Sequence, residues 1–176
     1  MSELYEQIVA GRGSLENLLT RIPGFEGYLD KSARRKADSM LRDHLADQID
    51  QLVVVFTRAE NTILNAGGLV HMSRTREIKS KIQAYRDRVK TAAPGYSGMW
   101  AAVEVGDKEL ERLYAFDEAQ IRFVDALRNA INDLEIAANS GEGLETALVQ
   151  VQQAANDAND AFVLRDDEIL RLSQSL

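Results

Sequence analysis

Apolar residues recur every three or four positions along most of this chain, which is the spacing of one buried face of an α-helix. From residue 31 to residue 65 the pattern continues without interruption and predicts one helix ~50 Å long, at 1.5 Å per residue. Its apolar face consists of Ala37, Leu41, Leu45, Ile49, Leu52, Phe56, Ala59 and Ile63. Gly67 and Gly68 end this helix, because glycine is the preferred residue just beyond a helix C-terminus.

Another helical stretch follows directly and ends near residue 92. Only a short turn separates it from the helix before it, so the two must run antiparallel. In an antiparallel hairpin, residues at the same level have numbers with a constant sum. A sum of 134 pairs Phe56 with Ile78, Leu52 with Ile82, Ile49 with Tyr85 and Leu45 with Val89. The apolar faces of the two helices therefore match in the predicted hairpin, residues 31–92.

The last part of the chain predicts a second hairpin, residues 107–174, with Asp107 as the N-cap of its first helix. That first helix carries two apolar stripes, which predicts burial on two sides. A sum of 282 aligns the apolar positions of the two helices and places Asp117 opposite Arg165, where a charge interrupts the apolar face of the second helix. Because an unpaired buried charge is very costly, we predict a buried Asp117–Arg165 ion pair. Such a pair either fixes the register of the hairpin or grips a ligand.

Two short helical patterns occupy residues 2–22, separated by Gly11 and Gly13. The segment IPGFEGY, residues 22–28, follows them, and its proline and two glycines predict a structured turn. We therefore predict an all-α fold, a bundle of long antiparallel helices made of the two hairpins and the short N-terminal helices.

If the hairpins stack with their open ends together, one pole of the bundle gathers most of the unusual residues. It holds IPGFEGY, the similar loop PGYSG at residues 94–98, and several charged side chains. Aromatic and arginine side chains gathered at one place are typical of protein interfaces. The candidate binding residues at this pole are Phe25, Tyr28, Arg34, Arg35, Asp38, Tyr96 and Trp100.

Three charged residues of this set and its neighbourhood share one helical face. Arg34, Asp38 and Arg42 are four residues apart, so the carboxylate can bridge two guanidinium groups. The arrangement is consistent with a solvated charge ladder, with an anchor for the backbone carbonyls of residues 22–28, or with a site for an anion or an acidic partner.

The composition excludes several chemistries. The 176 residues are 45% hydrophobic and 28% charged, with two prolines, which fits a single globular domain spanning residues 1–176. The chain has no cysteine, so disulfides, thiolate nucleophiles and Cys-ligated zinc are excluded. No basic segment followed by an apolar run opens the chain, and no stretch approaches ~18 consecutive apolar residues, so we expect a cytoplasmic protein.

The net charge of −7 is unevenly distributed. Residues 1–93 carry 15 basic and 12 acidic side chains, whereas residues 94–176 carry 6 and 16. Because the acidic half repels phosphates, nucleic acid is an unlikely partner. The helix before residue 92 is locally basic, through Arg74, Arg76, Lys79, Lys81, Arg86, Arg88 and Lys90. This stripe is either a solvated face or a surface for anionic lipid or RNA.

Motifs for catalysis or metal binding are not evident. Neither His44 nor His71 has a glutamate three residues before it, as di-iron bundles do, and Asp157 and Asp160 lack the spacing of a Ca²⁺ loop. The chain has no phosphate loop, dinucleotide fingerprint or nucleophile elbow, and it does not match the carboxylate pairs of the all-α nucleotide pyrophosphohydrolases. We therefore expect no catalytic residue, no metal site and no cofactor.

The stretch IPGFEGYLDKSARRKADSMLRDHL, with APGYSGMW and LYAFD further on, resembles an uncharacterised family of bacterial all-helical proteins with the signature IPGFxGY…RRxxDxxLR. The resemblance covers most of residues 22–118. It implies a bacterial source. It also implies a partner among membrane-associated SPFH-type scaffold proteins, near which the family occurs.

Three hypotheses of function follow. The first is a non-catalytic protein-interaction module, a scaffold or adaptor, whose protein partner docks at the loop-bearing pole. The second is a scaffold peripheral to the inner membrane that places its basic helix on an anionic membrane surface. The third is a small-molecule site or enzyme around Asp117 and Arg165. The two apolar stripes of the helix that begins at residue 107 also allow a homodimer.

Overall fold

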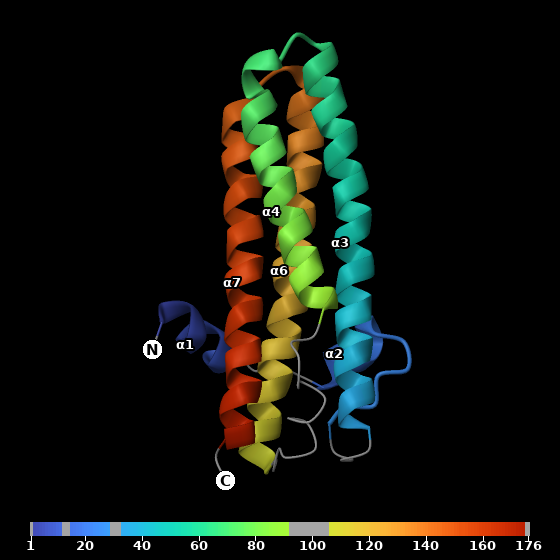
Figure 1. The fold of residues 1–176 in the computed structure, drawn as a ribbon, viewed down its shortest axis with the longest axis vertical. Helices are drawn as coiled ribbons and strands as arrows, with labels where there is room; N and C mark the ends of the chain where they lie inside the picture. The colour runs from blue at the N-terminus through green and yellow to red at the C-terminus, as the bar shows by residue number, and fades with distance from the viewer. Residues whose placement is uncertain (1, 12–14, 29–32, 92–105, 175–176) are drawn as a thin grey trace.

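The computed structural model describes residues 2–11, 15–28, 33–91 and 106–174, and every regular element in these ranges is a helix. Two long hairpins run side by side along the longest axis of the molecule, and two short helices lie against their lower half (Figure 1). The predicted all-α bundle is confirmed. The helices are α1 (Glu3–Ala10), α2 (Leu15–Arg21), α3 (Arg34–Asn65), the 3₁₀ turn η1 (Leu69–His71), α4 (Met72–Lys90), α6 (Asp107–Ser140) and α7 (Leu144–Gln174).

The first hairpin, α3 and α4, turns where the two glycines predict it. Gly67 adopts a positive φ of 88°, and the N–H of Gly68 donates to the carbonyl of Ile63 at 2.9 Å, which closes the end of α3. All eight residues that the predicted register pairs across the seam are buried. Arg86 of α4 also forms an ion pair with Asp50 of α3 at 2.8 Å, at a level close to that register.

The second hairpin, α6 and α7, begins one residue earlier than the sequence analysis predicts. Gly106 is the N-cap in an extended conformation, and its N–H donates to the Glu109 carboxylate at 3.2 Å. Asp107 is instead the first helical residue, where an acidic side chain interacts favourably with the positive end of the helix dipole. The prediction of Asp107 as the N-cap was therefore wrong by one position, within the usual uncertainty of helix ends.

Helix α6 is the central element of the bundle. It packs against α7 on one side and α3 on the other, and α1 and α2 also contact it. Neighbours on more than one side of α6 account for the two apolar stripes. Residues from both stripes, such as Leu113 and Ile131, are completely buried. Burial on two sides, as predicted, is confirmed.

The two hairpin turns lie at the same end of the bundle (Figure 1). Arg74 of α4 pairs with Glu145 of α7 at 3.0 Å near these turns, and Arg42 of α3 pairs with Asp166 of α7 at 2.9 Å near the opposite end. The opposite end is called the open pole below. It comprises the first turns of α3 and α6, the last turns of α7 and the segment 22–28.

Tyr85 of α4 provides a test of how the core is packed. Its ring is completely buried against the edge of Phe162, and among the described residues its hydroxyl has no hydrogen-bond partner. Removing an unpaired buried hydroxyl relieves a desolvation cost, so we expect Tyr85→Phe to raise the free energy of unfolding by about 1 kcal/mol in urea titrations.

The matched control is Tyr114→Phe. The Tyr114 hydroxyl accepts a hydrogen bond from the backbone N–H of Tyr28 at 3.1 Å, so its removal leaves that donor unpaired. We expect Tyr114→Phe to lower the free energy of unfolding by about 1 kcal/mol. Equal losses in the two variants would mean that the Tyr85 hydroxyl is satisfied in solution.

Candidate functional site

A buried ion pair joins the two helices of the second hairpin at the open pole. Arg165 of α7 donates from Nε to the Oδ1 atom of Asp117 of α6 at 2.7 Å, and both side chains are 0% exposed. The predicted Asp117–Arg165 pair is confirmed, at the level that the register of the hairpin requires.

Tyr28 extends this pair to the segment before α3. Its hydroxyl donates to Oδ2 of Asp117 at 2.5 Å and accepts from Nη2 of Arg165 at 3.2 Å. The backbone carbonyl of Tyr28 accepts a hydrogen bond from Nε of Arg34 at 3.0 Å. Arg34 therefore anchors a backbone carbonyl of the 22–28 segment, which is one of the alternatives left open for it.

Asp38 connects the same pair to α3. Its Oδ1 atom accepts from Nη2 of Arg165 at 2.7 Å, and its Oδ2 atom accepts from Nε of Arg42 at 3.1 Å. Asp38 does bridge two guanidinium groups, but one of them comes from α7. Arg42 also donates to the carbonyl of Val89 at 3.0 Å and to Asp166 at 2.9 Å, so it joins α3 to α4 and α7.

These side chains make one nearly enclosed network, called the buried cluster. Its members are Tyr28, Arg34, Asp38, Arg42, Asp117, Arg165 and Asp166. Three guanidinium groups balance three carboxylates, so burial of the cluster leaves no net charge uncompensated. The ring of Phe162 lies beneath two of the cations, 5.0 Å from the guanidinium carbon of Arg42 and 5.9 Å from that of Arg165.

Burial and the neighbouring charges change the acidity of the cluster. Burial raises the pKa of Asp117, while the charge of Arg165 and the hydrogen bond from Tyr28 act in the opposite direction. Burial raises the pKa of Tyr28 well above its ordinary value, and the Asp117 carboxylate adds to this effect. The phenol of Tyr28 therefore stays protonated and serves as a hydrogen-bond donor.

The predicted binding residues do not form the surface patch that the sequence analysis predicts. Phe25 is buried with its ring edge-on to Tyr28 at 5.8 Å, because the 22–28 segment folds over the end of the core. Four of the seven candidates are thus interior residues, namely Phe25, Tyr28, Arg34 and Asp38. As exposed anchors of a docking surface, these four were wrong. Arg35 is exposed, whereas Tyr96 and Trp100 lie outside the described residues.

The chemistry open to the buried cluster is limited. Asp117 and Arg165 are closed from solvent, and none of the three surface pockets that the structure describes is lined by either of them. In the described part of the chain, no three carboxylate or imidazole groups are arranged to hold a metal ion. Hydrogen bonds of Arg165 in the buried cluster join α3, α6, α7 and the 22–28 segment at the open pole.

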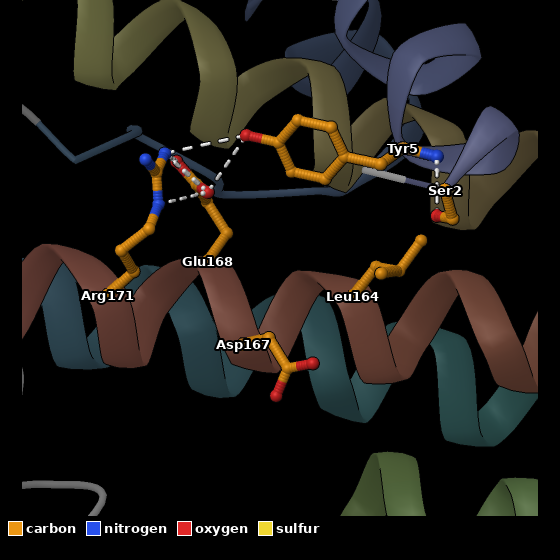
Figure 2. Close-up of a pocket in the computed structure, with 6 residues that line it drawn as sticks. All are labelled: Ser2, Tyr5, Leu164, Asp167, Glu168 and Arg171. Carbon is orange, nitrogen blue, oxygen red and sulfur yellow. Dashed lines mark hydrogen bonds and ion pairs between the residues drawn. The ribbon is translucent and has the colours of Figure 1, made fainter.

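An exposed pocket lies beside the buried cluster, between α1 and α7 (Figure 2). It has a volume of about 330 Å³ and is lined by Ser2, Tyr5, Leu164, Asp167, Glu168 and Arg171. Figure 2 shows Arg171 and the Tyr5 hydroxyl converging on the Glu168 carboxylate. The distances are 2.7 Å from Nη2 of Arg171 to Oε1 and 3.3 Å from the Tyr5 hydroxyl to Oε2.

Glu168 is the residue of this pocket that sequence reasoning missed. It follows two aspartates near the C-terminal end of the chain and resembles an ordinary surface charge, yet its side chain is 1% exposed. Arg112 of α6 also lies within 3.4 Å of it, and Arg112 faces Glu168 at nearly the level that the sum of 282 predicts. The register of the second hairpin could have revealed Glu168, because it places a basic residue of α6 close to an acidic residue of α7. The same kind of signal predicted the Asp117–Arg165 pair.

The basic side chains of α4 are largely engaged within the molecule. Ion pairs link Arg74 to Glu145, Lys79 to Glu60, Lys81 to Glu77 and Arg86 to Asp50. Arg76, Arg88 and Lys90 are exposed, and within the described ranges no ion pair involves them. Helix α4 therefore presents fewer uncompensated charges than its sequence indicates.

Comparison of the chain with protein-family models, curated proteins and solved structures gives no match. The family resemblance based on IPGFxGY and RRxxDxxLR stays a prediction. Among the helices that the structure describes, none is both long and apolar enough to cross a bilayer.

Substitution of Arg165 tests how much the buried cluster contributes to the free energy of unfolding. Replacing it with methionine leaves Asp117 and Asp38 buried beside an apolar side chain, so we expect Arg165→Met to lower the free energy of unfolding by about 3–5 kcal/mol. Adding Asp117→Asn removes one of the stranded charges, and the double variant is expected to lose about 1–3 kcal/mol less than the sum of the single variants. Urea titrations of all three measure this coupling.

Arg128→Met is the matched control, because Arg128 pairs with Asp125 at a partly exposed position of α6. A loss of less than about 1 kcal/mol is expected there. Arg165→Lys keeps a cation in place and supplies the same comparison if the methionine variant does not fold. Strict additivity of the Arg165 and Asp117 substitutions would show that the pair is not energetically coupled.

The buried phenols predict a loss of stability at high pH. Burial raises the pKa of Tyr85 as well as that of Tyr28, so the folded state keeps protons that unfolded tyrosines release near pH 10. The contribution of these phenols to the free energy of unfolding is therefore fully present below about pH 10. Above that pH the free energy of unfolding falls by about 1.4 kcal/mol per pH unit for each such tyrosine.

Tyr85→Phe removes one of these two protons and isolates its effect. Relative to wild type, this variant is expected to gain about 1.4 kcal/mol between pH 8 and pH 11, measured as the difference between their urea unfolding free energies. Parallel pH profiles of the two proteins would mean that the Tyr85 phenol ionises in the folded state.

Proposed function

We propose that this chain is a non-catalytic protein-interaction module, of the scaffold or adaptor kind, whose protein partner binds at the open pole. The observation that carries the proposal is the closed buried cluster. Its charged groups are engaged with one another and with the backbone, so the cluster stabilises a platform and presents no reactive group to a substrate.

The docking surface of this proposal is the pocket between α1 and α7. The Tyr5 ring and the Leu164 side chain supply an apolar wall, and Arg171, which is 56% exposed, lies on its rim. An aromatic ring beside an arginine is a composition found at the energetic centres of protein interfaces. Exposed Arg35 at the start of α3 is the other residue that we assign to this role.

The rival functions have less support. A small-molecule site or an enzyme around Asp117 and Arg165 needs access to a pair that is 0% exposed. A peripheral membrane scaffold needs the positive charge of α4, and four of its basic side chains are already paired within the molecule. A bacterial cytoplasmic location, or one at the inner-membrane surface beside SPFH-type scaffold proteins, is part of the same proposal and rests on the motif resemblance alone.

Leu164→Ala tests the docking surface. It removes part of the apolar wall without introducing a charge, and we expect capture of the specific partner from native cells to fall at least about tenfold, which corresponds to 1.4 kcal/mol. The measurement is affinity purification with quantitative mass spectrometry, with circular dichroism to verify that the helices are intact.

Leu170→Ala is the matched control. Leu170 lies on the same helix and is 39% exposed, and it is not among the residues that line the pocket. Capture by this variant is expected to equal that of wild type. Arg35→Glu forms a second arm of the experiment, for the surface at the start of α3. Undiminished capture by both Leu164→Ala and Arg35→Glu would refute docking at the open pole.

A further inference from the structure

The pocket between α1 and α7 has room for a large side chain of a partner, but not for a whole helix. Its volume of about 330 Å³ lies at the lower end of the range of binding pockets, roughly 300–1,000 Å³. Figure 2 shows the Leu164 side chain pointing toward α1, where Tyr5 and Ser2 complete the lining. The Tyr5 ring and Leu164 make this lining mainly apolar, so an apolar group that enters the pocket gains free energy by leaving water.

The surface of the two helices that form the pocket is negatively charged. Helix α1 carries two acidic side chains and no basic one, and α7 carries six acidic side chains and two arginines. Arg165 is completely buried, and Arg171 donates to Glu168 from Nε at 3.1 Å and from Nη2 at 2.7 Å. Arg112 of α6 is also engaged, by Glu109 at 3.2 Å and by Glu168 at 3.4 Å. These arginines therefore leave the other carboxylates of α1 and α7 uncompensated.

Two of these carboxylates flank the apolar wall of the pocket. Asp160 is four residues before Leu164 and Asp167 is three residues after it, so all three lie on one face of α7. Both aspartates are exposed, and neither forms an ion pair with any of the described residues. Figure 2 shows the Asp167 carboxylate pointing away from α1. The two negative charges are therefore available to a molecule that binds at Leu164.

From this arrangement we propose that the pocket binds an apolar side chain of a positively charged segment of the partner, with cationic residues of that segment beside Asp160 and Asp167. The inference rests on the proposed function, because it names the chemistry of the partner that docks at the open pole. The apolar side chain supplies the free energy of binding, and the opposite charges speed association and select against acidic partners. Lysine and arginine suit the rim because their apolar stems cover apolar surface while their charged ends stay in water.

Binding of synthetic peptides to the full-length chain tests the inference. The probe is a fluorescein-labelled amphipathic peptide of about four helical turns, on the order of 15 residues, with leucine on one face and lysine on the other. Matched peptides replace every lysine with glutamate, or every leucine with serine. We expect the leucine–lysine peptide to bind at least about tenfold more tightly than either matched peptide, measured by fluorescence anisotropy. Its affinity is expected to fall severalfold between about 50 mM and about 500 mM NaCl, since salt screens exposed charges.

Variants of the chain locate the binding. Leu164→Ala is expected to weaken binding of the leucine–lysine peptide about tenfold. Asp160→Asn combined with Asp167→Asn is expected to weaken it about three- to tenfold and to reduce its salt dependence, because exposed ion pairs are individually weak. The matched control is Asp133→Asn combined with Glu142→Gln, which also removes two negative charges from exposed positions, near the turn between α6 and α7. This control is expected to leave the affinity unchanged, and circular dichroism verifies that each variant is folded.

Several outcomes would overturn the inference. If the control pair weakens binding as much as the Asp160 and Asp167 pair, the peptide responds only to the net charge of the chain. Equal binding of the leucine–glutamate peptide, or no binding of the leucine–lysine peptide, also contradicts a basic partner segment. The proposed function is judged separately, by partner capture from native cells. If Leu164→Ala reduces that capture and the Asp160 and Asp167 double variant does not, docking at the open pole stands and the basic segment is refuted.

Discussion

A fully buried arginine is the constraint on which the rest of this structure depends. The guanidinium group of Arg165 is 0% exposed, and an uncompensated charge in such a place would cost several kcal/mol. It is compensated by Asp117 of α6 and Asp38 of α3, and Tyr28 supplies a further polar contact. Because these partners come from three separate segments, satisfying one side chain fixes α3, α6, α7 and the 22–28 segment relative to one another.

The same constraint determines which part of the open pole can interact with other molecules. Arg34, Asp38 and Tyr28 are used inside the molecule, and the described surface around them is left to Arg35 and to the pocket beside α1. The pocket shares one feature with the buried cluster, a buried carboxylate that accepts hydrogen bonds from different elements. The Glu168 side chain is nearly inaccessible to solvent and receives hydrogen bonds from both α1 and α7.

Much of the fold follows from helical periodicity, because a long repeating pattern is a strong signal. The glycine turns end the helices as expected, and the constant sum of residue numbers correctly pairs Asp117 with Arg165. The error at Asp107 is small and concerns a single helix end. The candidate site was predicted less well. The sequence analysis correctly placed four residues at one pole but assigned them to its surface, namely Phe25, Tyr28, Arg34 and Asp38. The pattern along one helix does not show which other segments cover that helix.

The sequence alone determines the helices, the pairing within each hairpin and the identity of the buried Asp117–Arg165 ion pair, because these depend on residues close in number or aligned across a short turn. Only the tertiary structure decides how the two hairpins meet. The bonds of Arg165 to Asp38 and Tyr28, and those of Glu168 to Tyr5, join residues more than 100 positions apart. Such contacts depend on the packing of whole helices against each other, which no local pattern of polar and apolar positions encodes.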